Sequence, residues 1–315
     1  MSDVYLVTGG LGCLGAWALY FLQRAGKQAV CFDLSEDRRR LDLLLSHEEQ
    51  SAIPFVRGDL TDGKQVAGVF ERYAITHVVH LAALQVPFCR ANPTLGAQVN
   101  VTGTVNIFAA AQGAGVRQVA YASSIAVYGP AALYPPGLLA HDAPFAPQTL
   151  YGVYKVANEQ AAKVYWHEYG LASVALRPYT IYGLGRDQGL TSDPTKAMLA
   201  AARGENFHIN FGGTMQFQYA ADVARQFLAA AEEPANGALA FNLGTAPVAV
   251  ADVAEVIMAQ CPGVTITCAD TILPFPMGCD DSALRAHAGQ VFETPLGTGV
   301  AQTIAAFANW KQSTG

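Results

Sequence analysis

Short apolar runs alternate with longer, helix-length stretches over the first half of the chain. Val4–Thr8 and Gln28–Asp33 have the length and apolar content of buried strands, and residues 14–25 are predicted as a helix that Gly26 ends. Further strands are predicted at 53–57, 76–82, 116–122 and 173–177, and further helices at 36–45, 63–73, 94–114, 151–169 and 194–203. Because the strands are apolar on both sides, the alternation predicts a parallel sheet covered by helices.

The alternation of predicted strands and helices becomes irregular after Gly183, where Gly- and Pro-rich loops separate isolated helices. We therefore expect an α/β protein with a Rossmann-type doubly wound parallel sheet and a small, irregular C-terminal substrate domain. The predicted NAD-binding part comprises residues 1–176 and about 220–246. The predicted substrate-binding part comprises residues 177–219 and 247–315.

The chain has few charged residues, and this limits the classes of macromolecule that it is expected to bind. Of 315 residues, 51% are apolar and 14% are charged, against about 25% charged in an average soluble protein. This composition excludes a disordered chain. The net charge is −6, and the only basic run, residues 38–40, is flanked by acids. A nucleic-acid partner is therefore not expected.

The cysteines and the N-terminal segment indicate a cytoplasmic protein. The six cysteines are scattered without a Cys-x-x-Cys pair, so we expect a reducing compartment and neither a metal site nor a disulfide framework. Residues 4–23 are uncharged, but Asp3 precedes them, no basic residue comes before Arg24, and four glycines interrupt them. This pattern is not typical of a signal peptide or a membrane span.

A glycine pattern marks the expected cofactor site. Gly9, Gly12 and Gly15 follow the first predicted strand and open the first predicted helix. Glycines at this turn let the backbone approach a pyrophosphate, whose charge the helix N-terminus stabilises. Asp33 lies 18 residues after Gly15, at the end of the second strand, where it can bind ribose hydroxyls and repel a 2′-phosphate. NAD is therefore the expected cofactor, and NADP held by residues 38–40 is the alternative.

A tyrosine and a lysine supply the candidate chemistry. Tyr151 and Lys155 are four residues apart in a predicted helix, so they share one helical face. An ammonium group and the positive nicotinamide ring are expected to lower the pKa of the Tyr151 phenol toward neutrality, which would make it a general acid/base. Ser123 and Ser124 follow the fifth strand, where a hydroxyl can hold a substrate oxygen.

Together these motifs resemble the extended short-chain dehydrogenase/reductase family, which includes the UDP-galactose 4-epimerases and sugar-nucleotide dehydratases. The resemblance covers nearly the whole chain and rests on residues 8–15, 80–83, 100–104, 123–129, 151–155 and 177–183. It implies that Ser124, Tyr151 and Lys155 are the catalytic residues, with Lys155 also binding the nicotinamide ribose. The proton of a substrate hydroxyl then moves to Tyr151 while hydride passes to the nicotinamide.

The cofactor-binding set is extended by position and by the resemblance. Asp59 follows the third predicted strand, where its carboxylate can reach the adenine amino group. The cofactor-binding residues are then predicted as Gly9, Gly12, Leu14, Gly15, Asp33, Asp59, Leu60, Leu81, Ala82, Ala83, Asn100, Tyr151 and Lys155.

The substrate half departs from the pattern of the nucleotide-sugar enzymes. Where that pattern has an asparagine, a proline and an arginine, this chain has Thr180, Leu184 and Met215, and residues 273–282 contain no basic residue. A diphosphate needs cationic partners or helix ends, so a smaller substrate is favoured: a sugar, sugar acid, lactone or similar hydroxy compound. The predicted substrate contacts are Gln85, Ser124, Thr180 and Arg186.

Three functions remain as hypotheses. The favoured one is an NAD-dependent dehydrogenase acting on a small hydroxy compound. The alternative is a nucleotide-sugar 4-epimerase or dehydratase that retains its NAD, and the third is a non-catalytic dinucleotide sensor. The resemblance also implies a homodimer formed by the helices at 94–114 and 151–169, both of which carry more apolar and small residues than one sheet-facing stripe needs.

Overall fold

Seven parallel strands form the main sheet of the protein. The computed structural model describes residues 3–313, and of residues 311–313 only the backbone. The strand order is β10-β6-β5-β4-β1-β2-β3, and every pairing is parallel. The strands are β1 Val4–Thr8, β2 Gln28–Asp33, β3 Phe55–Arg57, β4 His77–His80, β5 Gln118–Ala122, β6 Ala172–Arg177 and β10 Ala238–Asn242. The prediction of an α/β, Rossmann-type sheet is confirmed.

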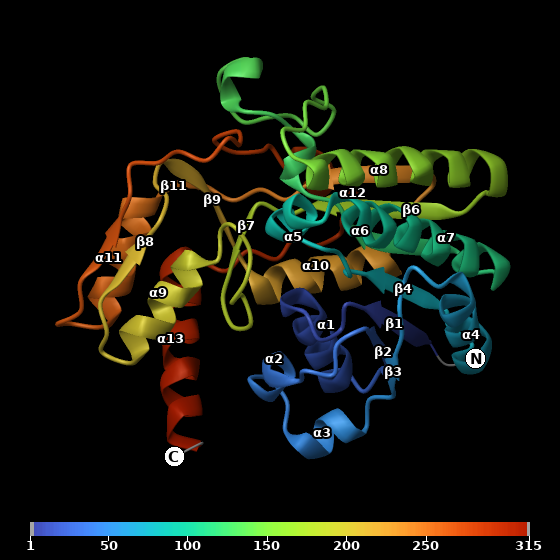
Figure 1. Cartoon of the computed structure of the whole chain (residues 1–315), viewed down its shortest axis with the longest axis horizontal. Helices are drawn as coiled ribbons and strands as arrows, with labels where there is room; N and C mark the ends of the chain where they lie inside the picture. The colour runs from blue at the N-terminus through green and yellow to red at the C-terminus, as the bar shows by residue number, and fades with distance from the viewer. Residues whose placement is uncertain (1–2, 314–315) are drawn as a thin grey trace.

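Helices cover both faces of this sheet (Figure 1). On one face lie α4 Gly63–Tyr73, α7 Gly103–Gly113 and α8 Leu150–Tyr169, and on the other lie α1 Cys13–Arg24 and α10 Ala220–Glu232. Alternate residues of β1 serve the two layers: Tyr5 and Val7 join the cluster around α1, whereas Leu6 joins the cluster around α4 and α7. Burial on both faces explains why the strands are apolar throughout.

The C-terminal half adds a smaller layer beside the sheet. Strands β7 Thr180–Tyr182, β9 Thr214–Tyr219 and β11 Pro247–Ala249 form one small sheet, and β8 Phe207–Ile209 pairs with β12 Ile266–Cys268. Helices α9 Asp193–Ala202, α11 Val250–Gln260 and α13 Leu296–Ser313 pack around them (Figure 1). Most of these strands have three residues, too few for a periodic sequence signal. The division of the chain into two domains stays a prediction.

The uncharged stretch at residues 4–23 folds as β1, a glycine loop and most of α1. Within the described part of the chain, no helix combines the length and the hydropathy that a membrane crossing requires.

Two predicted helices differ from the observed ones. The helix expected at 36–45 is wrong: the structure has two short helices, α2 Arg39–Asp42 and α3 His47–Ser51. Ser35 and Asp37 bind backbone amides two residues ahead, and Ser46 caps α3, so local side-chain bonds compete with one continuous helix.

The helix expected at 94–114 is interrupted in its middle. It comprises α6 Pro93–Ala97, a π-helical turn at Gln98–Thr102, and α7. The carbonyl of Asn100, inside the π turn, accepts hydrogen bonds from Thr104 Oγ1 at 2.7 Å and Asn158 Nδ2 at 2.9 Å. These side-chain donors support a wider turn, which hydrophobic periodicity does not predict.

Candidate active site

A cavity of about 500 Å³ opens at the carboxyl ends of β1, β2, β4 and β5. This edge is where β1 and β4 lie side by side and the connections leave toward opposite faces, the usual binding crevice of such sheets. The cavity brings together most of the sequence-predicted site residues: Gly9, Gly12, Leu14, Gly15, Asp33, Asp59, Leu60, Leu81, Ala82, Ala83, Gln85, Ser124, Tyr151, Lys155 and Arg186.

Two predicted site residues do not line this cavity. Asn100 is buried, and its side chain donates to the carbonyl of Leu84 at 2.9 Å and accepts from the Leu84 amide at 2.7 Å. It therefore supports the wall at Leu84 from behind. The expectation that Thr180 contacts substrate finds no support in the geometry: Thr180 is fully buried and donates to Met215 Sδ at 3.2 Å.

The glycine loop forms a cradle that side chains would fill. A Cβ at Gly15 would lie 2.0 Å from the carbonyl oxygen of Gly9, and Gly9 itself has φ +67° with the Ala82 backbone 2.8 Å from a Cβ position. Gly12 caps α1 without any side-chain bond, so the first amides of the helix remain available to an anion. This cradle fits the pyrophosphate of NAD.

Asp33 stands at the end of β2 beside the cradle. Its Oδ2 accepts from the Leu11 amide and its Oδ1 from the Ser35 amide, both at 2.9 Å. Carboxylate oxygens have further lone pairs that can accept from ribose hydroxyls. Asp59 also lines the cavity, with Oδ1 bound to the amide and the hydroxyl of Thr61 at 2.8 Å.

The guanidinium groups of the basic run at residues 38–40 are already engaged by other groups of the protein, which agrees with NAD rather than NADP. The guanidinium of Arg38 lies over the Phe55 ring, and those of Arg39 and Arg40 pair with Asp187. Of the three, only Arg40 lines the cavity.

Tyr151, Ser124 and Lys155 lie close together in the lining of the cavity. Thr149 caps α8 by accepting from the Gly152 amide at 3.0 Å, which places Tyr151 in the first turn. The Lys155 side chain is 3% exposed; its Nζ donates to the Ala122 carbonyl at 2.6 Å and lies 5.5 Å from the centre of the Tyr151 ring. Ser124 follows β5, and its Oγ accepts from the Ala126 amide at 3.1 Å.

Burial dominates the electrostatics of Tyr151. Burial raises the pKa of Tyr151 to about 12, and a hydrogen bond from Ser124 and the charge of Arg186 oppose this rise. Burial likewise lowers the pKa of Lys155 to about 8. In the protein without cofactor, desolvation outweighs the nearby positive charge of Arg186. The expected lowering by Lys155 together with the nicotinamide ring stays a prediction for the cofactor-bound protein.

Gln85 and Arg186 leave buried polar atoms without partners. Gln85 Oε1 and Arg186 Nε are both inaccessible and unbonded. Both side chains converge on Gly189, where a Cβ would lie 2.4 Å from Gln85 Oε1 and 3.0 Å from Arg186 Nη2. The Arg186 guanidinium donates one long hydrogen bond, from Nη2 to Thr191 Oγ1 at 3.4 Å. Unpaired buried donors and acceptors are costly, so this corner is suited to a polar ligand group.

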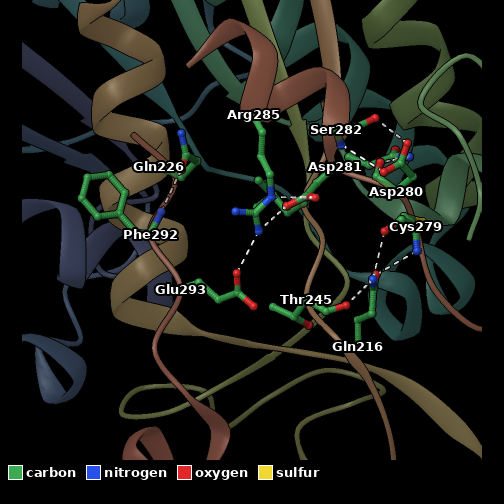
Figure 2. Close-up of polar contacts among 12 residues, drawn as sticks. Gln216, Gln226, Thr245, Cys279, Asp280, Asp281, Ser282, Arg285, Phe292 and Glu293 are labelled. Carbon is green, nitrogen blue, oxygen red and sulfur yellow. Dashed lines mark hydrogen bonds and ion pairs between the residues drawn. The ribbon is translucent and has the colours of Figure 1, made fainter. Parts of the chain in front are cut away.

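Among the described residues, Arg186 is the one arginine in the cavity lining that forms no ion pair with a carboxylate, since Arg40 pairs with Asp187. Met215 is buried, and Arg285, which follows the segment 273–282, pairs with Asp281 Oδ2 at 3.0 Å and Glu293 Oε2 at 2.8 Å away from the cavity (Figure 2). The basic residues lining the cavity are Arg40, Lys155 and Arg186.

Several lining residues escaped sequence reasoning. Most of them are apolar, and all of them line the cavity: Val86, Phe88, Tyr179, Ile181, Leu190, Thr191 and Phe275. Tyr179 and Ile181 flank Thr180 within the stretch 177–183 that carries the resemblance, and Val86 follows Gln85, so the position of these three next to predicted contacts could have marked them.

Comparison with known proteins shows which family the chain belongs to. The family model described as "NAD dependent epimerase/dehydratase family" matches residues 5–244. UDP-glucuronate 4-epimerase 4 of Arabidopsis thaliana is 31% identical over 81% of this chain, which spans 63% of that relative's length.

Two solved structures share the fold. UDP-glucose 4-epimerase of Thermus thermophilus, solved in complex with NAD, is 25% identical with a TM-score of 0.83 over 96% of this chain and 98% of its own. A GalE-like L-threonine dehydrogenase from Cupriavidus necator, 24% identical over 96% of this chain and 99% of its own with a TM-score of 0.83, shows that dehydrogenases also use this fold. The family model covers most of the chain, and the glycine cradle fits NAD. The chain therefore belongs to the NAD-dependent epimerase/dehydratase family.

Proposed function

We propose that this protein reversibly oxidises a secondary alcohol carbon of an acidic sugar and acts as a 4-epimerase that retains its NAD. The observation that carries the proposal is the meeting of Ser124, Tyr151 and Lys155 in the same cavity as the glycine cradle and Asp33. When bound, NAD supplies the acceptor and donor of hydride.

The chain's own residues move the proton and hold the reacting oxygen. Tyr151 Oη takes the proton of the substrate hydroxyl and returns it to the ketone in the reverse step. Ser124 Oγ donates a hydrogen bond to the same substrate oxygen. Tyr151 accepts the proton as a phenolate, and the buried Lys155 ammonium, fixed by the Ala122 carbonyl, stabilises this phenolate before the transfer and again when the proton has returned to the substrate.

Epimerisation is favoured over net oxidation because the named relatives are nucleotide-sugar 4-epimerases. This reverses the preference for a dehydrogenase that the sequence motifs suggested. An epimerase must keep both the ketone and the reduced cofactor until the hydride returns to the other face of the ring, so no reduced cofactor accumulates.

An acidic substrate is supported by Arg186. Its Nε is buried and unbonded beside the unbonded Gln85 Oε1, and a carboxylate oxygen would satisfy the guanidinium. A uronate-type sugar carries such a group next to its ring, as the substrate name of the Arabidopsis relative indicates for that protein.

An NAD-dependent sugar-acid dehydrogenase is the second candidate. It is favoured by the scarcity of free cations for a diphosphate: Thr180 and Met215 pack together, and Arg285 is held by Asp281 and Glu293 (Figure 2).

One panel of substrates separates the two candidates. The purified protein is incubated with NAD and uronates, UDP-uronates, neutral sugars or UDP-sugars, and both NADH absorbance and the proton NMR spectrum of the sugar are followed. The proposal predicts 4-epimerisation of an acidic sugar without accumulation of NADH. Stoichiometric NADH with a keto-acid product would establish the dehydrogenase, and turnover of neutral sugars alone would refute the acidic-substrate proposal.

A further inference from the structure

A backbone segment lies against the first turns of α1, next to the glycine loop of the cofactor cradle. This segment, residues 183–187, follows β7 and is called the strap below. The Leu184 carbonyl accepts a hydrogen bond from Trp17 Nε1 of α1 at 3.1 Å. Gly185, with φ +83°, lies beside the start of α1: a Cβ there would be in van der Waals contact with Cys13 Cα, at 3.5 Å. The strap therefore packs against the first turns of α1, at the helix end expected to face the pyrophosphate.

One guanidinium joins the strap to the glycine loop. Arg40 donates from Nε and Nη2 to Asp187 Oδ1 at 3.0 and 2.6 Å, and from Nη1 to the Leu11 carbonyl at 3.1 Å. The Arg40 side chain is 17% exposed and that of Asp187 41%. Two charge-assisted bonds from one planar group constrain both partners more than a single exposed contact does. Arg39 adds a weaker contact to Asp187 at 3.4 Å.

Both members of this pair line the cavity, although they are 147 residues apart in the chain. The pair thus bridges the nucleotide half and the substrate half at the cradle. A dinucleotide that extends from Asp33 to Lys155 would lie in the cavity that both members of the pair line.

We infer that Arg40 and Asp187 form a latch that slows the release of bound NAD or NADH, and that they are positioning residues for cofactor retention. The inference rests on the proposed function, because an epimerase must hold the reduced cofactor between its two half-reactions. The pair acts through the strap and takes no part in proton transfer.

The test measures the release of NADH from the purified full-length protein in the absence of substrate. NADH-loaded protein is mixed with excess NAD in a stopped-flow instrument, and the loss of NADH fluorescence gives the rate constant. In Asp187→Asn and in Arg40→Gln we expect release to be about tenfold faster than in wild type, equivalent to about 1.4 kcal/mol. The double variant should release NADH no faster than the faster single variant, since both changes open one latch.

Lys196→Gln is the matched control. Lys196 lies on α9, its ammonium pairs with Asp193 at 3.4 Å, and its side chain is 42% exposed. The substitution removes an ion pair close to the strap in sequence without touching the cavity lining, so the release rate should stay within twofold of wild type.

Each latch variant removes one partner of the same ion pair. Either variant is therefore sufficient for the test if the other does not fold. Release rates within twofold of wild type in the folded latch variants would overturn the latch alone, and so would an equal increase in Lys196→Gln. A protein that binds no NADH would overturn both the latch and the proposed function. Faster release with substrate turnover retained at saturating NAD supports the latch.

Discussion

A buried ion pair behind the active site gives a stability prediction that the structure makes quantitative. Glu159 and Arg177 are 2% and 3% exposed, and they share bonds of 2.8 Å (Nε to Oε1) and 2.6 Å (Nη2 to Oε2). Ser123 donates to the same carboxylate. Replacing Glu159 by Gln removes the negative charge and leaves the guanidinium buried without a counter-ion.

The expected loss in the free energy of unfolding comes from the uncompensated charge of Arg177 rather than from the lost contact. Breaking one side of a buried pair typically costs about 3–5 kcal/mol, so Glu159→Gln should lower the free energy of unfolding by about 4 kcal/mol. The matched control is Glu293→Gln, which breaks the ion pair with Arg285. The side chain of Glu293 is 42% exposed and that of Arg285 is 46% exposed. An exposed pair contributes about 0–1 kcal/mol.

Urea titration followed by circular dichroism measures both variants under one set of conditions. The expected result is a large shift of the unfolding midpoint for Glu159→Gln, a small shift for Glu293→Gln, and unchanged slopes. If Glu159→Gln lost no more stability than the control, the inference that this pair is desolvated and needs mutual compensation would be refuted.

Three further predictions concern substrate, pH and assembly. Arg186→Gln should raise KM for an acidic substrate about 30-fold, equal to about 2 kcal/mol, and leave NAD affinity unchanged; an equal effect on a neutral sugar in steady-state kinetics would contradict the carboxylate contact. Because burial lowers the pKa of Lys155 from 10.5 to about 8, the unfolded chain binds more protons between these values, and stability should rise with pH there. Lys155→Met should therefore stabilise the cofactor-free protein by up to about 3 kcal/mol at pH 7, with the gain fading above pH 8 in thermal unfolding; destabilisation would contradict this. The expected homodimer should sediment as a dimer and dissociate in Val164→Glu, since Val164 is an exposed residue of α8; a monomeric wild type would refute it.

The sheet and the site edge were predictable because they depend on local patterns. Continuous apolar strands such as Val4–Thr8 need cover on both faces, which predicts parallel order and helices on each side. Asp33 ends one strand and Ser124 follows another, and the carboxyl ends of parallel strands share one edge. That relation brings residues from distant motifs into one cavity without any knowledge of side-chain contacts.

The features that the sequence did not predict depend on contacts between distant residues. Thr180 matched the position of a family asparagine, but its side chain turns to Met215, 35 residues away. The pKa of Tyr151 depends on how completely the cavity walls exclude water, which spacing from Lys155 does not encode. The bond between Arg40 and Asp187 spans 147 residues, so an acid-flanked basic run gave no sign of its partner.

The most direct test of the central claim compares two tyrosines of the same helix. Tyr151→Phe removes the phenolic oxygen that is proposed to move the proton, whereas Tyr154→Phe removes one that donates to the Pro93 carbonyl at 2.9 Å outside the cavity lining. Turnover of the substrate found in the panel and NADH affinity are measured for both variants. The account predicts that Tyr151→Phe binds NADH within twofold of wild type and loses at least about a hundredfold in kcat, while Tyr154→Phe keeps both. Retained turnover in Tyr151→Phe would contradict the account.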